Sequence, residues 1–152
     1  MNSEPHAARQ WTLWTEMWDL LSRINFTHGY AFVRELDLHG PTTGDLTVSY
    51  HYKSEVTGGA FSTLEEGVAR AKAAYTDVFG EPPTEPARRF TVTDHRHGTT
   101  ETFWVRSAGE LAERGICGRR SAQAAWEHGH ASSAEEHVTE VPSAPPHTLG
   151  DL

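Results

Sequence analysis

Apolar positions recur with a helical period near the start of the chain. The run WTLWTEMWDLL, residues 11–21, has one stripe made of Trp11, Trp14, Trp18 and Leu21. A second apolar row, Leu13, Met17 and Leu20, lies beside it. Spacings of three and four residues place side chains on one face of a helix. The pattern therefore predicts a helix, although so many aromatic residues also suit a strand.

The next apolar positions alternate with polar ones. Between residues 46 and 53 the alternating apolar residues are Leu46, Val48, Tyr50 and Tyr52. The preceding run YAFVRELDL, residues 30–38, also suits a strand, and Gly, Pro and Asp in residues 39–45 are typical of a turn. These two runs predict a β-hairpin.

The strongest helical pattern covers residues 62–79. One face is apolar and consists of Leu64, Val68, Ala71, Tyr75 and Val78. Ser62 and Glu65 have the spacing of a capping box at the start of a helix. Gly80 suits the left-handed position that ends a helix, and Pro82 and Pro83 prevent its continuation.

A second hairpin and two short helices follow. The runs RRFTVTD, 88–94, and ETFWVRS, 101–107, flank the turn HRHGTT. Ser107 and Glu110 form a second capping box, which opens a helix through Arg114, and a further helical stretch runs from 119 to 128. The predicted order is α-ββα-ββα. It indicates an α+β fold in which two hairpins form a mostly antiparallel four-stranded sheet with helices on one face.

The two ends of the chain lack apolar periodicity. Residues 1–9 are expected to be disordered, and residues 131–152 are rich in Ser, Glu and Pro, which predicts a disordered acidic tail. One domain over residues 10–130 remains between them. The two ββα stretches resemble each other weakly, with Phe32 and His39-Gly40 aligning with Phe90 and His97-Gly98, so an internal duplication is one hypothesis.

Composition narrows the classes of function. The formal charge is −8, of which the tail carries −4, so binding of nucleic acid by phosphate neutralisation is disfavoured. No apolar run is long enough to cross a membrane, the N-terminus has no signal core, and the single cysteine excludes an internal disulfide framework. A cytoplasmic protein that does not bind membranes is expected. Eleven Arg against two Lys suit a GC-rich genome, and a phage or mobile-element origin is one hypothesis.

Ten histidines raise the question of a metal site. His95 and His97 share one hairpin turn, and His39 would join them if the two turns lie together. Three imidazoles are enough to bind zinc. The motifs of known zinc enzymes are absent, and spacing alone does not make side chains converge, so solvent-exposed histidines are the favoured interpretation.

Other catalytic signatures are weaker. Cys117 lies near Arg114, Arg119 and Arg120, which would favour a reactive thiolate, but a lone cysteine is more often a packed residue. No phosphate-binding loop and no nucleophile elbow occurs in the sequence. We therefore expect no cofactor, no catalytic residue and, on balance, no enzyme.

Residues 110–126 resemble a helix-turn-helix. Arg119, Arg120 and Gln123 would then contact phosphates and base edges. Nearby glutamates balance the arginines, and the turn is short for this motif. A helical cap packed on the sheet is the favoured alternative.

The tryptophan stripe carries the leading functional hypothesis. Tryptophan is enriched where proteins bind one another, and a small domain cannot easily bury three of them. We therefore expect a non-enzymatic interaction or accessory protein, whose partner is an unknown protein or a second copy in a homodimer. The binding residues would be Trp11, Trp14, Trp18 and Leu21. A DNA-binding regulator is the alternative, and a histidine-based metal protein or enzyme comes third.

Overall fold

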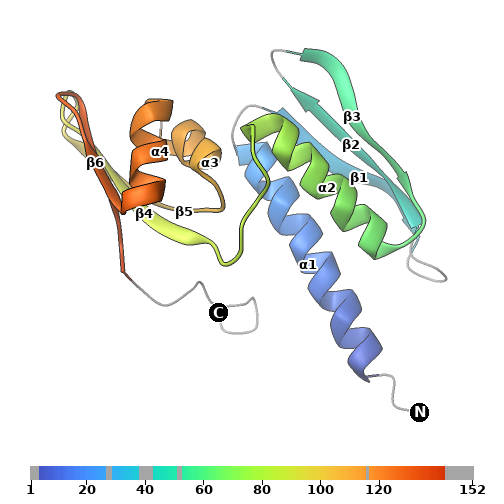
Figure 1. Ribbon diagram of the computed structural model, residues 1–152. Coiled ribbons are helices and arrows are strands. Elements are labelled where there is room, and N and C mark those ends of the chain that lie inside the picture. The colour runs from blue at the N-terminus through green and yellow to red at the C-terminus, as the bar shows by residue number, and fades with distance from the viewer. Residues whose placement is uncertain (1–3, 27–28, 38–42, 51–52, 116, 143–152) are drawn as a thin grey trace. The chain divides into compact units, whose positions relative to one another are not determined.

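A computed structural model describes residues 4–26, 29–37, 43–50, 53–115 and 117–142. It confirms the predicted α+β class, with helices and antiparallel sheets (Figure 1). The chain divides into two compact units, unit 1 at residues 1–80 and unit 2 at residues 81–152. The two predicted hairpins therefore lie in separate sheets, of three and four strands, and not together in one four-stranded sheet. Each unit has its own sheet and its own core.

Unit 1 contains two helices and a three-stranded sheet. Its elements in chain order are α1 (Glu4–Phe26), β1 (Gly29–Asp37), β2 (Thr43–Tyr50), β3 (Lys53–Phe61) and α2 (Leu64–Phe79). The strand order is β1-β2-β3 and both pairings are antiparallel. The first predicted hairpin is therefore confirmed as β1 and β2. The strand β3 was not predicted, because its sequence KSEVTGGAF has no regular apolar alternation.

The N-terminal helix is longer than its apolar stripe. It includes Glu4 to Arg9, which were expected to be disordered. The early residues extend the helix by backbone hydrogen bonding, which needs no apolar side chain. Arg9 also joins α1 to α2, because its Nε lies 3.3 Å from Oε1 of Glu65.

The helix α2 is capped one residue later than predicted. Thr63, not Ser62, is the N-cap, and its hydroxyl accepts a hydrogen bond from the backbone N–H of Glu66. The Glu66 carboxylate accepts from the N–H and the hydroxyl of Ser62. The sequence Ser-Thr-Leu-Glu-Glu holds two overlapping boxes, so spacing alone does not choose between them. At the other end, Gly80 has a φ of 85°, as predicted for a left-handed cap.

Both helices of unit 1 cover the same side of its sheet (Figure 1). The helix α1 packs against α2 and the edge strand β1, whereas α2 packs against β2 and β3. The core between them includes the fully buried Met17, Leu20, Leu21, Ile24, Tyr75 and Phe79.

Unit 2 contains two helices and a four-stranded sheet. Its elements are β4 (Arg88–Asp94), β5 (Thr99–Val105), α3 (Ala108–Gly115), α4 (Arg119–His128), β6 (His130–Ser132) and β7 (Glu136–Glu140). The strand order is β5-β4-β7-β6, with every pairing antiparallel. The second predicted hairpin and both short helices are confirmed. One half of the predicted capping box of α3 is confirmed, since the Ser107 hydroxyl accepts from the N–H of Glu110, while the Glu110 carboxylate accepts from the N–H of Arg106.

The expected disorder from residue 131 onward is incorrect as far as residue 140. The strand β7 lies between β4 and β6, and it buries Val138 completely in the core of unit 2. Glu140 accepts two hydrogen bonds, of 2.8 and 2.9 Å, from Arg88, whose guanidinium lies 4.2 Å from the ring centre of Trp126. A central strand is held mainly by backbone bonds to two neighbours, so a polar composition does not prevent it.

The two ββα stretches occupy different places in their sheets. In unit 1 the first strand of the hairpin, β1, is an edge strand, whereas in unit 2 the corresponding strand, β4, has partners on both sides. The resemblance between the two stretches therefore does not extend to their sheet topology. Of the helices in the described residues, none is both long enough and apolar enough to span a membrane.

Candidate functional site

The predicted partner-binding residues separate into two groups on α1. Leu21 has no exposed surface and belongs to the core, so it is not available to a partner. Trp11 is 60% exposed. Trp14 and Trp18 are partly buried against the core and contact each other edge to face, with ring centres 5.5 Å apart. We call Trp11, Trp14 and Trp18 the tryptophan flank.

Trp11 lies on the side of α1 opposite to Arg9. Two residues mark the side of α1 that faces α2. Arg9 is paired with Glu65 of α2, and Met17 lies close to Gly67 of α2, since its sulfur would be 3.1 Å from a methyl group placed on that glycine. Trp11 follows Arg9 by two residues, which is about 200° around a helix. The flank therefore begins at the core, where Trp14 and Trp18 pack, and extends to the exposed Trp11 on a helix that also packs on the edge strand β1.

The predicted DNA-contacting residues lie on α4. Arg119 and Arg120 are exposed in its first turn. Gln123 is also exposed, and its side chain donates a 2.9 Å hydrogen bond to Glu127. The inner side of the same helix pair is buried against the sheet through Leu111, Ala122 and Ala125. The arrangement has the packing of a helical cap, with the arginines at its outer surface.

The predicted metal ligands do not form a cluster in the described part of the chain. His39 lies outside the described residues, and His95 and His97 are exposed in the turn between β4 and β5. Nδ1 of His97 lies 2.7 Å from Oδ2 of Asp94. Within the described ranges, no three His, Cys, Asp or Glu residues are placed to hold a metal ion.

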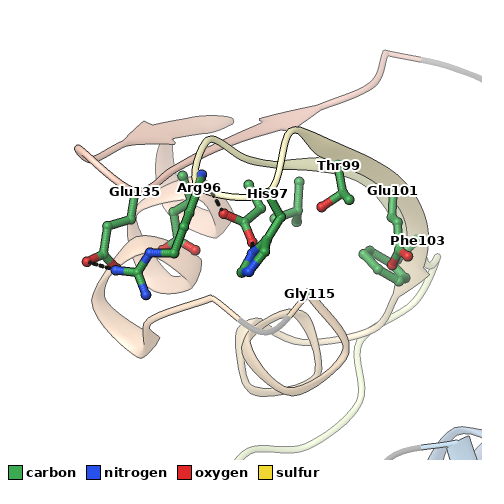
Figure 2. Close-up of a pocket in the computed structure, with 10 residues that line it drawn as sticks. Arg96, His97, Thr99, Glu101, Phe103, Gly115 and Glu135 are labelled. Atoms are coloured by element: carbon green, nitrogen blue, oxygen red, sulfur yellow. Dashed lines mark hydrogen bonds and ion pairs between the residues drawn. The ribbon is translucent and has the colours of Figure 1, made fainter.

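A pocket of about 390 Å³ lies beside this turn in unit 2. Figure 2 shows His97 at its middle, with Arg96 and Glu135 on one side and Thr99, Glu101 and Phe103 on the other. The lining residues are Val92, Asp94, Arg96, His97, Thr99, Glu101, Phe103, Gly115, Glu135 and Glu136.

The pocket is acidic. Its lining has four carboxylates and one arginine, and Arg96 is already paired with Glu135 at 2.9 Å. Asp94 and Glu136 are direct neighbours across the β4–β7 pair. The hydrogen bond from His97 holds the pKa of Asp94 below its usual value, and Glu136 accepts a hydrogen bond from the N–H of Gly118. This lining suits a polar or positively charged group.

Cys117 is not an activated nucleophile. Burial, followed by the negative charge of Glu136, raises the pKa of its thiol to about 12. The nearby arginines were expected to have the opposite effect. A thiol with so high a pKa is protonated at neutral pH, so Cys117 acts as a packed side chain beside Leu111, whose carbonyl accepts a 3.7 Å contact from its sulfur.

Comparisons with protein-family models, curated proteins and solved structures found no match to this chain. Functional inference therefore depends on geometry. The pocket residues Glu101, Glu135 and Glu136 were not identified from the sequence, because they come from separate segments and two of them lie in the expected tail. The exposure of Trp11 next to the burial of Leu21 was also not predictable, since both lie on one apolar stripe.

Proposed function

We propose that this protein is a non-enzymatic interaction module, which binds another protein through the tryptophan flank of α1. The observation that carries the proposal is the exposure of Trp11 at 60%, beside two further tryptophans that are half buried. Trp14 and Trp18 are held by the core, so the flank presents a rigid aromatic surface. Ordered aromatic residues lose little conformational entropy on binding, which is why they dominate binding energy at protein interfaces.

The position of the flank supports the same proposal. Two charged residues of α1 lie away from the flank: Arg9 faces α2, and Arg23 is buried and paired with Asp19 at 3.0 Å. The centre of a protein interface is typically aromatic and depleted in charge. A partner that covers Trp11, Trp14 and Trp18 therefore meets an aromatic surface with no charged residue between them on that side of α1.

Site-specific photo-crosslinking in the native cells tests this function. A photoreactive amino acid replaces Trp11 in one variant and Thr12 in the matched control, because Thr12 is also exposed but lies about 100° further around α1. We expect protein adducts from position 11 and few from position 12. Equal labelling at both positions, or no adduct at position 11, would show that the flank is not a binding surface.

DNA binding through α3 and α4 is the alternative, and the exposure of Arg119 and Arg120 favours it. A carboxylate of Glu136 already lies at the start of α4, 3.2 Å from the N–H of Gly118, where a phosphate would approach. We therefore rank this alternative second. A mobility-shift assay over a range of salt concentrations tests it: tight binding that Arg119→Ala with Arg120→Ala abolishes would reverse the ranking.

A further inference from the structure

The sheet of unit 1 has two outer edges, and they differ in what lies above them. In the described residues no strand pairs with the outer edge of β1 or of β3. Above β3 lies α2, whose exposed residues are small or charged, namely Glu65, Ala69, Lys72, Ala73 and Asp77. Above β1 lies α1 with the tryptophan flank. An open strand edge is an attachment point for another strand, and among the side chains that the structure describes, exposed tryptophan lies beside the β1 edge.

The outer side of α1 has a charge-free strip that is longer than the tryptophan flank. It runs through Ala7, Trp11, Trp14, Trp18 and Ser22, at spacings of four, three, four and four residues. Both end residues, Ala7 and Ser22, are small and exposed. The large side chains are therefore in the middle of the strip, and the small ones are at its ends.

This strip is complementary to itself when reversed. If two α1 helices run antiparallel about a two-fold axis between positions 14 and 15, Trp11 of each lies opposite Trp18 of the other. In the same register Ala7 lies opposite Ser22. Large residues then meet large ones, small ones meet small ones, and no like charges are brought together. A two-fold axis requires that a surface match its own reverse in this way.

We propose that the partner of the tryptophan flank is a second copy of this chain. The two α1 strips pack antiparallel in the register that places Trp11 opposite Trp18, and the outer edges of β1 meet beneath them. The proposal rests on the function proposed above, and it names the partner. A two-fold axis perpendicular to the sheets keeps both α1 helices on the same side of the joined sheets. The contact between the two helices requires this arrangement.

The size of the contact indicates a dimer of moderate affinity. The 23-residue α1 is about 35 Å long and about 10 Å wide, so its outer side offers about 350 Å². The regular part of β1, which pairs with β2 without a shift from residue 29 to 34, adds an edge about 20 Å long. Two copies would then bury about 1,100 Å², near the lower limit of specific interfaces. We expect a dissociation constant in the micromolar range.

Sedimentation of the full chain tests the association. We expect a dimer above micromolar concentration, and Trp11→Glu should raise the dissociation constant at least about 30-fold. The control Thr12→Glu should leave it unchanged, since Thr12 points away from the strip. Trp11 is exposed, so its replacement does not empty the core. A wild-type monomer at 100 micromolar, or equal effects of both variants, would overturn the proposal.

Disulfide trapping tests the register. We expect Ala7→Cys and Ser22→Cys chains, mixed under mild oxidation, to form a disulfide between one of each. Ala7→Cys alone should not, because two copies of position 7 would lie about 22 Å apart in this register. Efficient disulfide formation between two Ala7→Cys chains would overturn the proposed register. The native Cys117 interferes little, since burial raises the pKa of its thiol to about 12.

Two results separate this inference from the function on which it rests. A photo-crosslinked product from position 11 with twice the 16.9 kDa mass of the chain would support both the homodimer and the interaction function. Photo-crosslinks to a different protein, with a monomer in sedimentation, would overturn the homodimer and leave the interaction function in place. No photo-crosslink at position 11 would overturn the interaction function itself.

Discussion

The substitution Val138→Ala tests whether the segment after α4 belongs to the fold of unit 2. Val138 is fully buried in β7, between β4 and β6. Replacing it removes two methyl groups and leaves a small cavity, which together cost about 2–3 kcal/mol. A unit of this size loses about 4–8 °C of melting temperature for each kcal/mol, so the expected decrease is about 10–20 °C.

The neighbouring residue provides the matched control. His137 is exposed on the opposite side of β7, so His137→Ala should cost less than about 1 kcal/mol. Calorimetry measures the transition, and hydrogen exchange of the β4 amides, residues 88–94, reports on unit 2 alone. If Val138→Ala is as silent as His137→Ala, then β7 is not packed in the core.

Truncation extends the same reasoning. Removal of residues 131–152 deletes β7 and all of β6 except His130, and it leaves β4 without its partner on that side, so the β4 amides should lose protection. Removal of residues 143–152 retains every described contact of β7, and the free energy of unfolding should change by less than about 0.5 kcal/mol. Equal stability of the two truncated chains would contradict the sheet order of unit 2.

Three further predictions follow from burial and charge. Val68→Asp should destabilise unit 1 by at least about 3 kcal/mol in denaturant titrations because it buries a charge, whereas Ala69→Asp on the exposed side of α2 should cost less than about 1 kcal/mol. The hydrogen bonds from Arg88 hold the pKa of Glu140 below its ordinary 4.5, so its stabilising contribution is present above that pH and is lost as the pH falls through the lower folded-state pKa. The unfolding midpoint of Glu140→Gln should therefore decrease less than that of the wild type between about pH 5 and about pH 3; parallel curves would exclude this pair as a cause. Because burial raises the pKa of Cys117 to about 12, the native protein should react with iodoacetamide at least about 100-fold more slowly than after denaturation, and comparable rates would show that the thiol is accessible and ionised.

Local patterns in the sequence predicted the elements that bury one regular face. The helix at 62–79 has an apolar side chain at every turn and a glycine at its end, and the structure places α2 there. The strand β3 has two glycines and no regular alternation, so its place beside β2 depends on backbone pairing that side chains do not reveal. The division into two sheets also depends on which strands pair, and hairpin patterns do not fix pairing beyond the hairpin.

The apolar stripe of α1 was correctly predicted as helical, but its two roles were not separable in the sequence. Trp11 and Leu21 lie on the same stripe, yet one is 60% exposed and the other fully buried. The difference depends on the position of α2 and the sheet beneath. Helical spacing indicates which residues share a side, but the packing of neighbouring elements determines how much of that side is covered.

The pocket of unit 2 depends on the pairing of β4 with β7, which the polar composition of β7 does not indicate. The antiparallel register of β4 and β7 places Asp94 directly opposite Glu136, and two like charges in that position repel each other. Each carboxylate is compensated locally, Asp94 by His97 and Glu136 by the N–H of Gly118. The histidine spacing points to His95 and His97 with His39, and it gives no sign of Glu136, because the acidic segment around Glu136 has the composition of a solvated tail. Pairing with β4 brings that acidic segment beside the histidine turn, and an acidic pocket forms there without a metal-binding triad among the described residues.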